Sequence, residues 1–203
     1  NAGSYVSGAK DVTFSTAPTI AQLATVDGYT TGTLTYTAVA DTGTNLATNA
    51  GSYVSGSRNV TFTDTPTIAQ LTTVDGFTAG TLSYAGVSDT AANLFANAGG
   101  YITGNKTVTF TDAPTVAQLT TVGAYTTGAM TYTAVSDTSA NLATNAGSYV
   151  TGSKNVTFAD APTIAQLTTV DGFTTGTLTY TAVTDTAANL ATNAGSYVSG
   201  AKD

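Results

Sequence analysis

The strongest constraint on this chain is an internal repeat of 48 residues. The string NAGSYVSG begins at Asn1 and again at Asn49, and close variants begin at Asn97, Asn145 and Asn193. The spacing never changes by an insertion or a deletion. A fixed period of this kind is typical of solenoids, in which each unit buries its apolar face against the next. The sequence therefore predicts four repeats and the start of a fifth, at residues 1–48, 49–96, 97–144, 145–192 and 193–203.

Each repeat divides into two unequal halves of about 24 residues, a length typical of one solenoid coil. In the second repeat, Asn59–Thr63 alternates polar and apolar side chains, which predicts a strand with one buried face. The following segment, Asp64–Gly76, has an early proline and ends in glycine, which predicts a short helix. We therefore expect an α/β solenoid, with parallel strands on one side and short helices on the other. An all-β solenoid is the alternative, because threonine is abundant and the helical stretches are brief.

Composition excludes several function classes. The chain has no His, Cys, Glu or Trp, and only 8% of its residues are charged. It therefore lacks an imidazole base, a thiol nucleophile and the usual ligands of zinc. The formal net charge of −7 with five Lys and Arg residues argues against nucleic acid as a partner. No apolar run approaches the roughly 20 residues that a membrane-spanning helix needs.

We do not expect an enzyme. Almost every candidate catalytic side chain occurs at the same position of four or five repeats, whereas an active site is normally one constellation in one pocket. No cofactor is expected either. Calcium is the competing use of the repeated aspartates, but the sequence contains no DxDxDG loop. Helix capping is the preferred interpretation of two aspartate rows, Asp41, Asp89, Asp137 and Asp185, and Asp64, Asp112 and Asp160, but not of the third row, Asp27, Asp75 and Asp171.

All the basic residues fall at one repeat position, directly before a predicted strand. They form a row that either keeps the surface soluble or meets an acidic face of a neighbouring chain. The members of this basic row are Lys10, Arg58, Lys106, Lys154 and Lys202.

Threonines occupy the outward positions of the predicted strands. A flat threonine array on parallel strands resembles the ice-binding face of antifreeze solenoids, although threonine is also a common residue of strand surfaces. The members of this threonine face are Thr13, Thr61, Thr109 and Thr157 in one half of the repeat and Thr35, Thr131 and Thr179 in the other, where Ser83 takes the remaining place.

Two further sets of rows bear on the core and the turns. Aromatic residues recur at inward positions, which predicts stacked rings in the core. Asparagines are expected to satisfy the backbone of turns as a buried row. The aromatic rows include Phe14, Phe62, Phe110 and Phe158, then Tyr36, Tyr84, Tyr132 and Tyr180, and a row that alternates Tyr29, Phe77, Tyr125 and Phe173; the asparagine row is Asn45, Asn93, Asn141 and Asn189.

The phrases DTAANLATNAG (Asp185–Gly195) and TIAQLTTVDGFTTGTLTY (Thr163–Tyr180) resemble repeats of very long bacterial secreted and surface proteins. This resemblance covers the whole chain and implies an extracellular or cell-surface location in a bacterium. It implies a fibre, a surface layer or an adhesin stalk. We expect a part of a longer array without capping repeats, associating end to end or laterally with identical chains. The alternative function is a surface-binding module that presents a regular face to a glycan or to ice.

Overall fold

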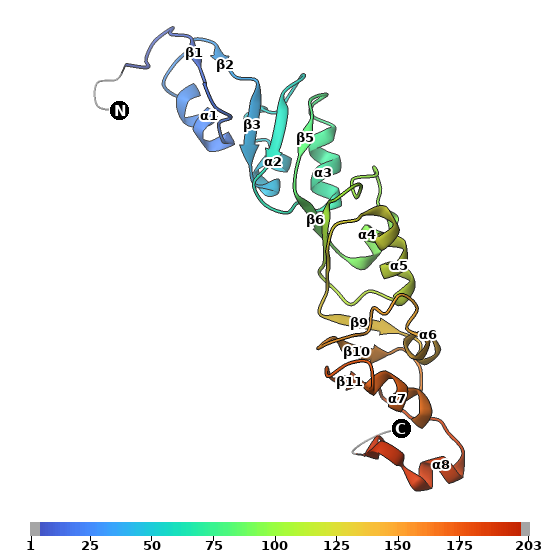
Figure 1. Cartoon of the computed structure of the whole chain (residues 1–203). Coiled ribbons are helices and arrows are strands. Elements are labelled where there is room, and N and C mark those ends of the chain that lie inside the picture. The colour runs from blue at the N-terminus through green and yellow to red at the C-terminus, as the bar shows by residue number, and fades with distance from the viewer. Residues whose placement is uncertain (1–4, 200–203) are drawn as a thin grey trace. The chain divides into compact units, whose positions relative to one another are not determined.

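A computed structural model describes residues 5–199 of the chain. Its internal contacts divide the chain into two units, Asn1–Ser88 with Ala98–Tyr101, and Asp89–Asn97 with Ile102–Asp203. Each unit is mixed α/β and consists of short strands and short helices that alternate along the sequence (Figure 1). The all-β alternative is therefore wrong.

The strands are two to four residues long and lie in four small sheets. In chain order they are β1 (Val12–Thr13), β2 (Leu34–Thr35), β3 (Ala38–Asp41), β4 (Asn59–Phe62), β5 (Leu82–Ser83), β6 (Gly86–Asp89), β7 (Thr107–Phe110), β8 (Met130–Thr131), β9 (Ala134–Asp137), β10 (Asn155–Phe158) and β11 (Leu178–Thr179).

The pairing of these strands is parallel, as the sequence predicted. In the first unit β1 pairs with β2, and β4 lies between β3 and β5. In the second unit β7 pairs with β8. Strand β10 lies between β9 and β11, as Figure 1 shows. Val60 of β4 is opposite Val39 on one side and Leu82 on the other, so paired residues are 21 or 22 apart in the sequence. No sheet closes into a barrel within the described residues.

The chain passes to a new sheet after β2, and then after every third strand. Only Tyr36 and Thr37 separate β2 from β3, yet these two strands belong to different sheets. Tyr132 and Thr133 separate β8 from β9 in the same way. Each sheet therefore contains at most three strands before the chain passes to the next one.

The helices begin with residues that favour their N-termini. They are α1 (Ile20–Asp27), α2 (Gly43–Thr48), α3 (Ile68–Asp75), α4 (Ala91–Ala96), α5 (Val116–Tyr125), α6 (Ser139–Thr144), α7 (Ile164–Asp171) and α8 (Ala187–Thr192), followed by the 3-10 turn η1 (Ala194–Ser196).

A threonine caps each α-helix. The Thr67 hydroxyl accepts from the Gln70 amide while the Gln70 side chain accepts from the Thr67 amide, which is a capping box. The same box opens α1, α5 and α7. The six-residue helices have a threonine cap and end at an asparagine in the left-handed region, such as Asn145 with φ of 46°. Helices this short are unstable alone, so their packing against neighbours must hold them in place.

The core lies between the helices and the inner faces of the sheets. Helical leucines and strand valines at equal repeat positions are fully buried, among them Leu71, Leu94, Val60 and Val108. Burial of one such side chain stabilises the fold by about 1.5–3 kcal/mol. Pairs of helices lie directly against each other, as α6 and α7 do beside the β9–β11 sheet (Figure 1).

The aromatic rows divide between the core and the surface. Phe62, Phe110 and Phe158 are buried, and each meets a tyrosine edge to face at 6.1 Å between ring centroids, as Phe62 does with Tyr84. These rows confirm the expected aromatic core. Tyr29, by contrast, is 48% exposed and Phe77 is 36% exposed, so the expectation of a fully buried set is wrong for that row.

Candidate functional site: the repeated surface

The basic row lies at the turns that enter β4, β7 and β10. Two of its cations lie against aromatic rings rather than extending into solvent. The Arg58 guanidinium lies 4.3 Å from the centroid of the Tyr36 ring, and the Lys154 ammonium lies 4.7 Å from that of Tyr132. Stacking of a cation on an aromatic face is favourable because the ring face carries negative potential. Lys10 is exposed, and Lys202 lies outside the described residues.

Arg58 is fixed further by its own turn. Its terminal nitrogen donates to the Ser55 carbonyl at 3.1 Å and to the Ser55 hydroxyl at 2.9 Å, whereas its buried Nε has no acceptor. The turn itself is tied down by Thr78, whose hydroxyl lies 2.7 Å from the Arg58 carbonyl and accepts from the Gly80 amide at 2.9 Å. A Cβ at Gly80 would collide with the Arg58 carbonyl, so only glycine fits there. We call this packing of Thr78 and Gly80 against the Arg58 carbonyl the backbone lock. It recurs along the chain and fixes the position of the basic row.

The tyrosines under the basic row connect it to the aspartates. The Tyr36 hydroxyl donates to the Tyr53 carbonyl at 2.9 Å, and the Tyr53 hydroxyl donates to the Asp27 carboxylate at 3.2 Å. Burial raises the pKa of the Tyr36 phenol; the Arg58 charge opposes this rise, and the Asp27 charge adds to it. Arg58 and Asp27 therefore have opposite effects on the pKa of the same phenol. In the third repeat Gly123 replaces this aspartate.

The threonine face points outward, as the sequence predicted for its positions. Thr61 lies opposite Ser83, and Thr157 lies opposite Thr179, on adjacent parallel strands. Most of these side chains are exposed, and Thr109 is half-buried. The face is not one continuous surface, because the steps between sheets interrupt it after two or three strands. It presents small groups of hydroxyls in register.

Aspartates join each helix to a segment further along the chain. The Asp41 carboxylate, at the end of β3, accepts from the Ile20 amide at the start of α1 at 2.9 Å. It also accepts from the Thr42 amide and from the Asn45 side chain, each at 2.8 Å. Asp64 in turn accepts from the Gly43 amide at the start of α2 at 2.8 Å. Carboxylates are stabilising there because the first amides of a helix have no partner within it.

The same link recurs with the same atoms along the chain. Asp112, Asp137, Asp160 and Asp185 accept from the first amides of α4, α5, α6 and α7, respectively. Hydrogen bonds from the Asn189 side chain and from the Thr186 and Ile164 amides lower the pKa of Asp185. These carboxylates are thus committed to capping. Within residues 5–199, no group of three or more His, Cys, Asp or Glu side chains gathers where a metal ion could bind.

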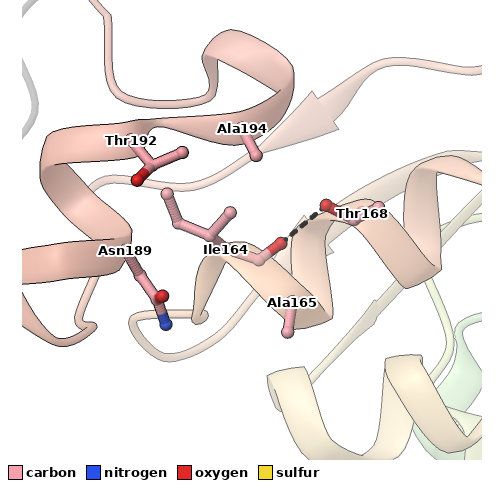
Figure 2. Close-up of a pocket in the computed structure, with 6 residues that line it drawn as sticks. All are labelled: Ile164, Ala165, Thr168, Asn189, Thr192 and Ala194. Atoms are coloured by element: carbon pink, nitrogen blue, oxygen red, sulfur yellow. Dashed lines mark hydrogen bonds between the residues drawn. The ribbon is translucent and has the colours of Figure 1, made fainter.

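Two grooves interrupt the second unit. One, of about 400 Å³, lies between α7 and α8 (Figure 2). Its polar side chains are already satisfied within the protein: the Thr168 hydroxyl donates to the Ile164 carbonyl at 2.9 Å, and the Asn189 amide donates to Asp185 at 2.7 Å. The Thr192 hydroxyl likewise donates to a carbonyl of its own helix at 2.9 Å. This groove therefore offers shape but few free polar groups.

The second groove, of about 390 Å³, lies between the ends of α6 and α7. Phe173 forms one wall, and the loop that contains Ser148 and Thr151 forms the other. Both hydroxyls are exposed and make no hydrogen bond within the protein. Sequence reasoning missed this groove, because it placed Phe173 in a core row. The signal was present in the repeat, since Phe173 follows a glycine at the end of a helix rather than lying in a strand.

No family model matches the chain, and no curated protein or solved structure is significantly similar to it. Function is therefore inferred from the sequence pattern and from the chemistry of the repeated surface. No helix among the described residues is long and apolar enough to cross a bilayer.

Proposed function

We propose that this chain is a solenoid segment of an extracellular bacterial structural protein, such as a fibre, a surface layer or an adhesin stalk. In this proposal each coil has about 24 residues, and two coils make one repeat. The resemblance to repeats of long bacterial surface proteins supports the location. In this role, copies of the chain associate end to end or laterally.

One observation carries the proposal. An aspartate at the end of a strand accepts from the first amide of a helix about one half-repeat earlier, as Asp41 does with Ile20 and Asp137 with Val116. A bond of this kind links each segment to the adjacent one and to no distant part of the chain. Stability then becomes a sum of nearest-neighbour terms, which suits an element that varies in length.

The surface of the chain supports the same role. Capping carboxylates and stacked cations are engaged by the preceding repeat, as Asp160 is by the Ser139 amide and Lys154 by the Tyr132 ring. A rod of repeated units serves as a spacer, because its length depends on the number of repeats and not on a particular tertiary contact.

The proposal is tested with versions of the chain that contain two, four and eight repeats. Small-angle scattering and electron microscopy should show a particle whose length grows linearly, by roughly 10 Å for each repeat if two strand spacings separate equal positions. A particle that grows equally in all directions would sink the solenoid proposal. Antibody labelling of intact cells of the source bacterium tests the location, and labelling that requires cell lysis would contradict it.

A second candidate function is supported by the threonine face. Hydroxyls such as those of Thr157 and Thr179 lie in register on adjacent parallel strands and face solvent. A regular array of this kind could bind an ordered surface, either ice or a glycan. Replacement of both residues by lysine should abolish thermal hysteresis or glycan binding if the face is the contact. Unchanged binding would exclude it.

A further inference from the structure

The groove between the ends of α6 and α7 has a rigid wall. Asn145, the left-handed C-cap of α6, grips the loop that follows it with both ends of its side chain. Its amide donates to the Val150 carbonyl at 2.9 Å, and its carbonyl oxygen accepts from the Val150 amide at 2.9 Å. Val150 is itself almost fully buried. The loop between them is therefore held in one conformation, which lowers the entropy cost of binding a ligand against it.

The chemistry inside this groove is specific. A partly exposed aromatic ring, Phe173, faces a loop that carries the unbonded hydroxyls of Ser148 and Thr151. None of the residues that line the groove carries a charge. The volume of about 390 Å³ falls within the range of roughly 300–1,000 Å³ that small-ligand sites occupy.

We infer that this groove binds a neutral saccharide unit. A pyranose ring has an apolar face of C–H groups and a rim of hydroxyls. The apolar face suits the Phe173 ring, and the rim suits the hydroxyls of Ser148 and Thr151, which both donate and accept hydrogen bonds. A charged ligand is disfavoured because the groove provides no opposite charge.

A comparison of the repeats supports this assignment. In the preceding repeat Tyr125 occupies the position of Phe173, and its hydroxyl donates to the Phe95 carbonyl at 3.0 Å. That bond holds the ring against the end of α4, which corresponds to the end of α6 beside the groove, and α5 extends to Tyr125. The aromatic ring at this position is thus held by a hydrogen bond of Tyr125 in the third repeat, whereas Phe173 in the fourth repeat has no hydroxyl to form one. The Phe173 ring therefore remains available to contact a ligand in the groove.

The first unit has a related but weaker version. Phe77 is 36% exposed, and Ser52 has the same left-handed φ of 56° as Ser148. The counterpart of Thr151 is Ser55, however, and its hydroxyl already accepts from Arg58 at 2.9 Å. The assignment therefore concerns the groove of the second unit. It goes beyond the structural role, and its residues differ from those of the threonine face.

The experiment uses the 203-residue chain in a Phe77→Ala background, which removes the related aromatic residue of the first unit. Arrayed neutral mono- and disaccharides of glucose, galactose, mannose and N-acetylglucosamine are the probes, and calorimetry measures the affinity of those that bind. We expect binding of at least one probe, with little dependence on salt. Phe173→Ala should weaken it about tenfold, because the ring supplies the apolar contact. Thr151→Val, which keeps the shape but removes a hydroxyl, should weaken it several-fold.

Phe95→Ala is the matched control, since it removes an exposed aromatic side chain that lies outside the groove. It should leave the affinity unchanged. Circular dichroism must show that each variant remains folded; Thr151→Val, at an exposed loop position, keeps the test decisive if Phe173→Ala does not fold. Absence of binding by the folded parent chain would overturn the inference. Equal weakening by Phe95→Ala, or none by both groove variants, would do so as well.

Discussion

The Asp137 carboxylate accepts a hydrogen bond from the Val116 amide at 2.9 Å, although 21 residues separate the two in the sequence. It also accepts from the Thr138 amide at 2.7 Å and from the Asn141 side chain at 2.8 Å. One side chain thus caps α5 and also holds the cap residue and the Asn141 side chain of α6. Asp137 is only 7% exposed, so water replaces these bonds poorly when the carboxylate is removed.

Replacement of Asp137 by alanine should lower the free energy of unfolding by about 2–4 kcal/mol, because it leaves three donors without an acceptor. Urea denaturation measures the loss, and hydrogen exchange at the Val116 amide should accelerate. Asp171→Ala is the matched control, because this exposed carboxylate accepts one bond, from the Tyr197 hydroxyl at 3.2 Å. Its cost should be about 0.5 kcal/mol or less. Similar losses for both variants would contradict the capping role.

The segment around α8 should lose stability in acid. The pKa of Asp185 is lowered in the folded state from the ordinary value of 3.8, chiefly by the Asn189 side chain and then by the Thr186 and Ile164 amides. A lowered carboxyl pKa contributes stability that is complete above the unfolded value and disappears as the pH falls through the folded value. Hydrogen exchange at Thr186 should therefore accelerate below about pH 4 relative to Asp185→Asn, which has no carboxylate to protonate. The same pH profile in both proteins would exclude Asp185 as the source.

Gly80→Ala should lower the stability of the fold far more than Gly56→Ala, although Gly56 pairs with Thr78, only two residues before Gly80. A Cβ at Gly80 would meet the Arg58 carbonyl, whereas a Cβ at Gly56 meets nothing within 4 Å. We expect a loss of about 3 kcal/mol or more at Gly80, from backbone displacement. At Gly56 only the left-handed φ of 65° has to be maintained by alanine, at about 1–2 kcal/mol. Thermal unfolding of the two variants decides the order, and a reversed order would refute the backbone lock.

Thr174→Val should destabilise the chain, and Thr157→Val should not. The Thr174 hydroxyl lies 2.6 Å from the Lys154 carbonyl and accepts from the Gly176 amide at 2.9 Å. Loss of this buried hydroxyl should cost about 1–3 kcal/mol, since the amide and the carbonyl lose their partner. Thr157 is exposed on its strand, where valine is equally suitable. Chemical denaturation compares the two, and equal stabilities would show that the buried hydroxyl has no structural role.

The sequence predicted those elements whose signals are local. The strand expected at Asn59–Thr63 forms as β4, and the helix expected within Asp64–Gly76 forms as α3. Alternation of polar and apolar residues requires only neighbouring side chains, and a capping box requires only four residues. The alternation of Leu82 and Tyr84 in the second half of the repeat also predicts a short strand, which forms as β5, whereas the following strand, Gly86–Asp89, has no such signal. Its pairing depends on residues far away in the sequence.

The contacts between segments were the harder part. Asp64 precedes α3 and was expected to open it, yet Thr67 caps that helix while Asp64 caps the start of α2. The asparagine row was misassigned for a similar reason. Asn45 is exposed and donates to Asp41, whereas Asn49, four residues later, satisfies the loop backbone. Both errors arise because a cap is defined by a partner about 20 residues away or by a left-handed φ, and neither leaves a local pattern.

The positions of the surface rows were predicted, but the contacts of their side chains and the continuity of the threonine face were not. The sequence placed the basic row at turns before strands, and the structure adds that Arg58 and Lys154 stack on Tyr36 and Tyr132, which directly follow β2 and β8. The outward direction of the threonine face followed from alternation alone. The interruption of that face by the steps at Tyr36 and Tyr132 did not, because it depends on which strands pair.

The narrow sheets affect how such a chain avoids aggregation. Threonine-rich and valine-rich strands of low charge are the type of segment that grows into cross-β fibrils when a long, flat edge is available as a template. A chain that leaves its sheet after at most three short strands offers only brief edges of two to four residues. The shortness of the strands, rather than the steps at Tyr36 and Tyr132, therefore leaves each edge with few unpaired backbone groups on which cross-β growth could begin.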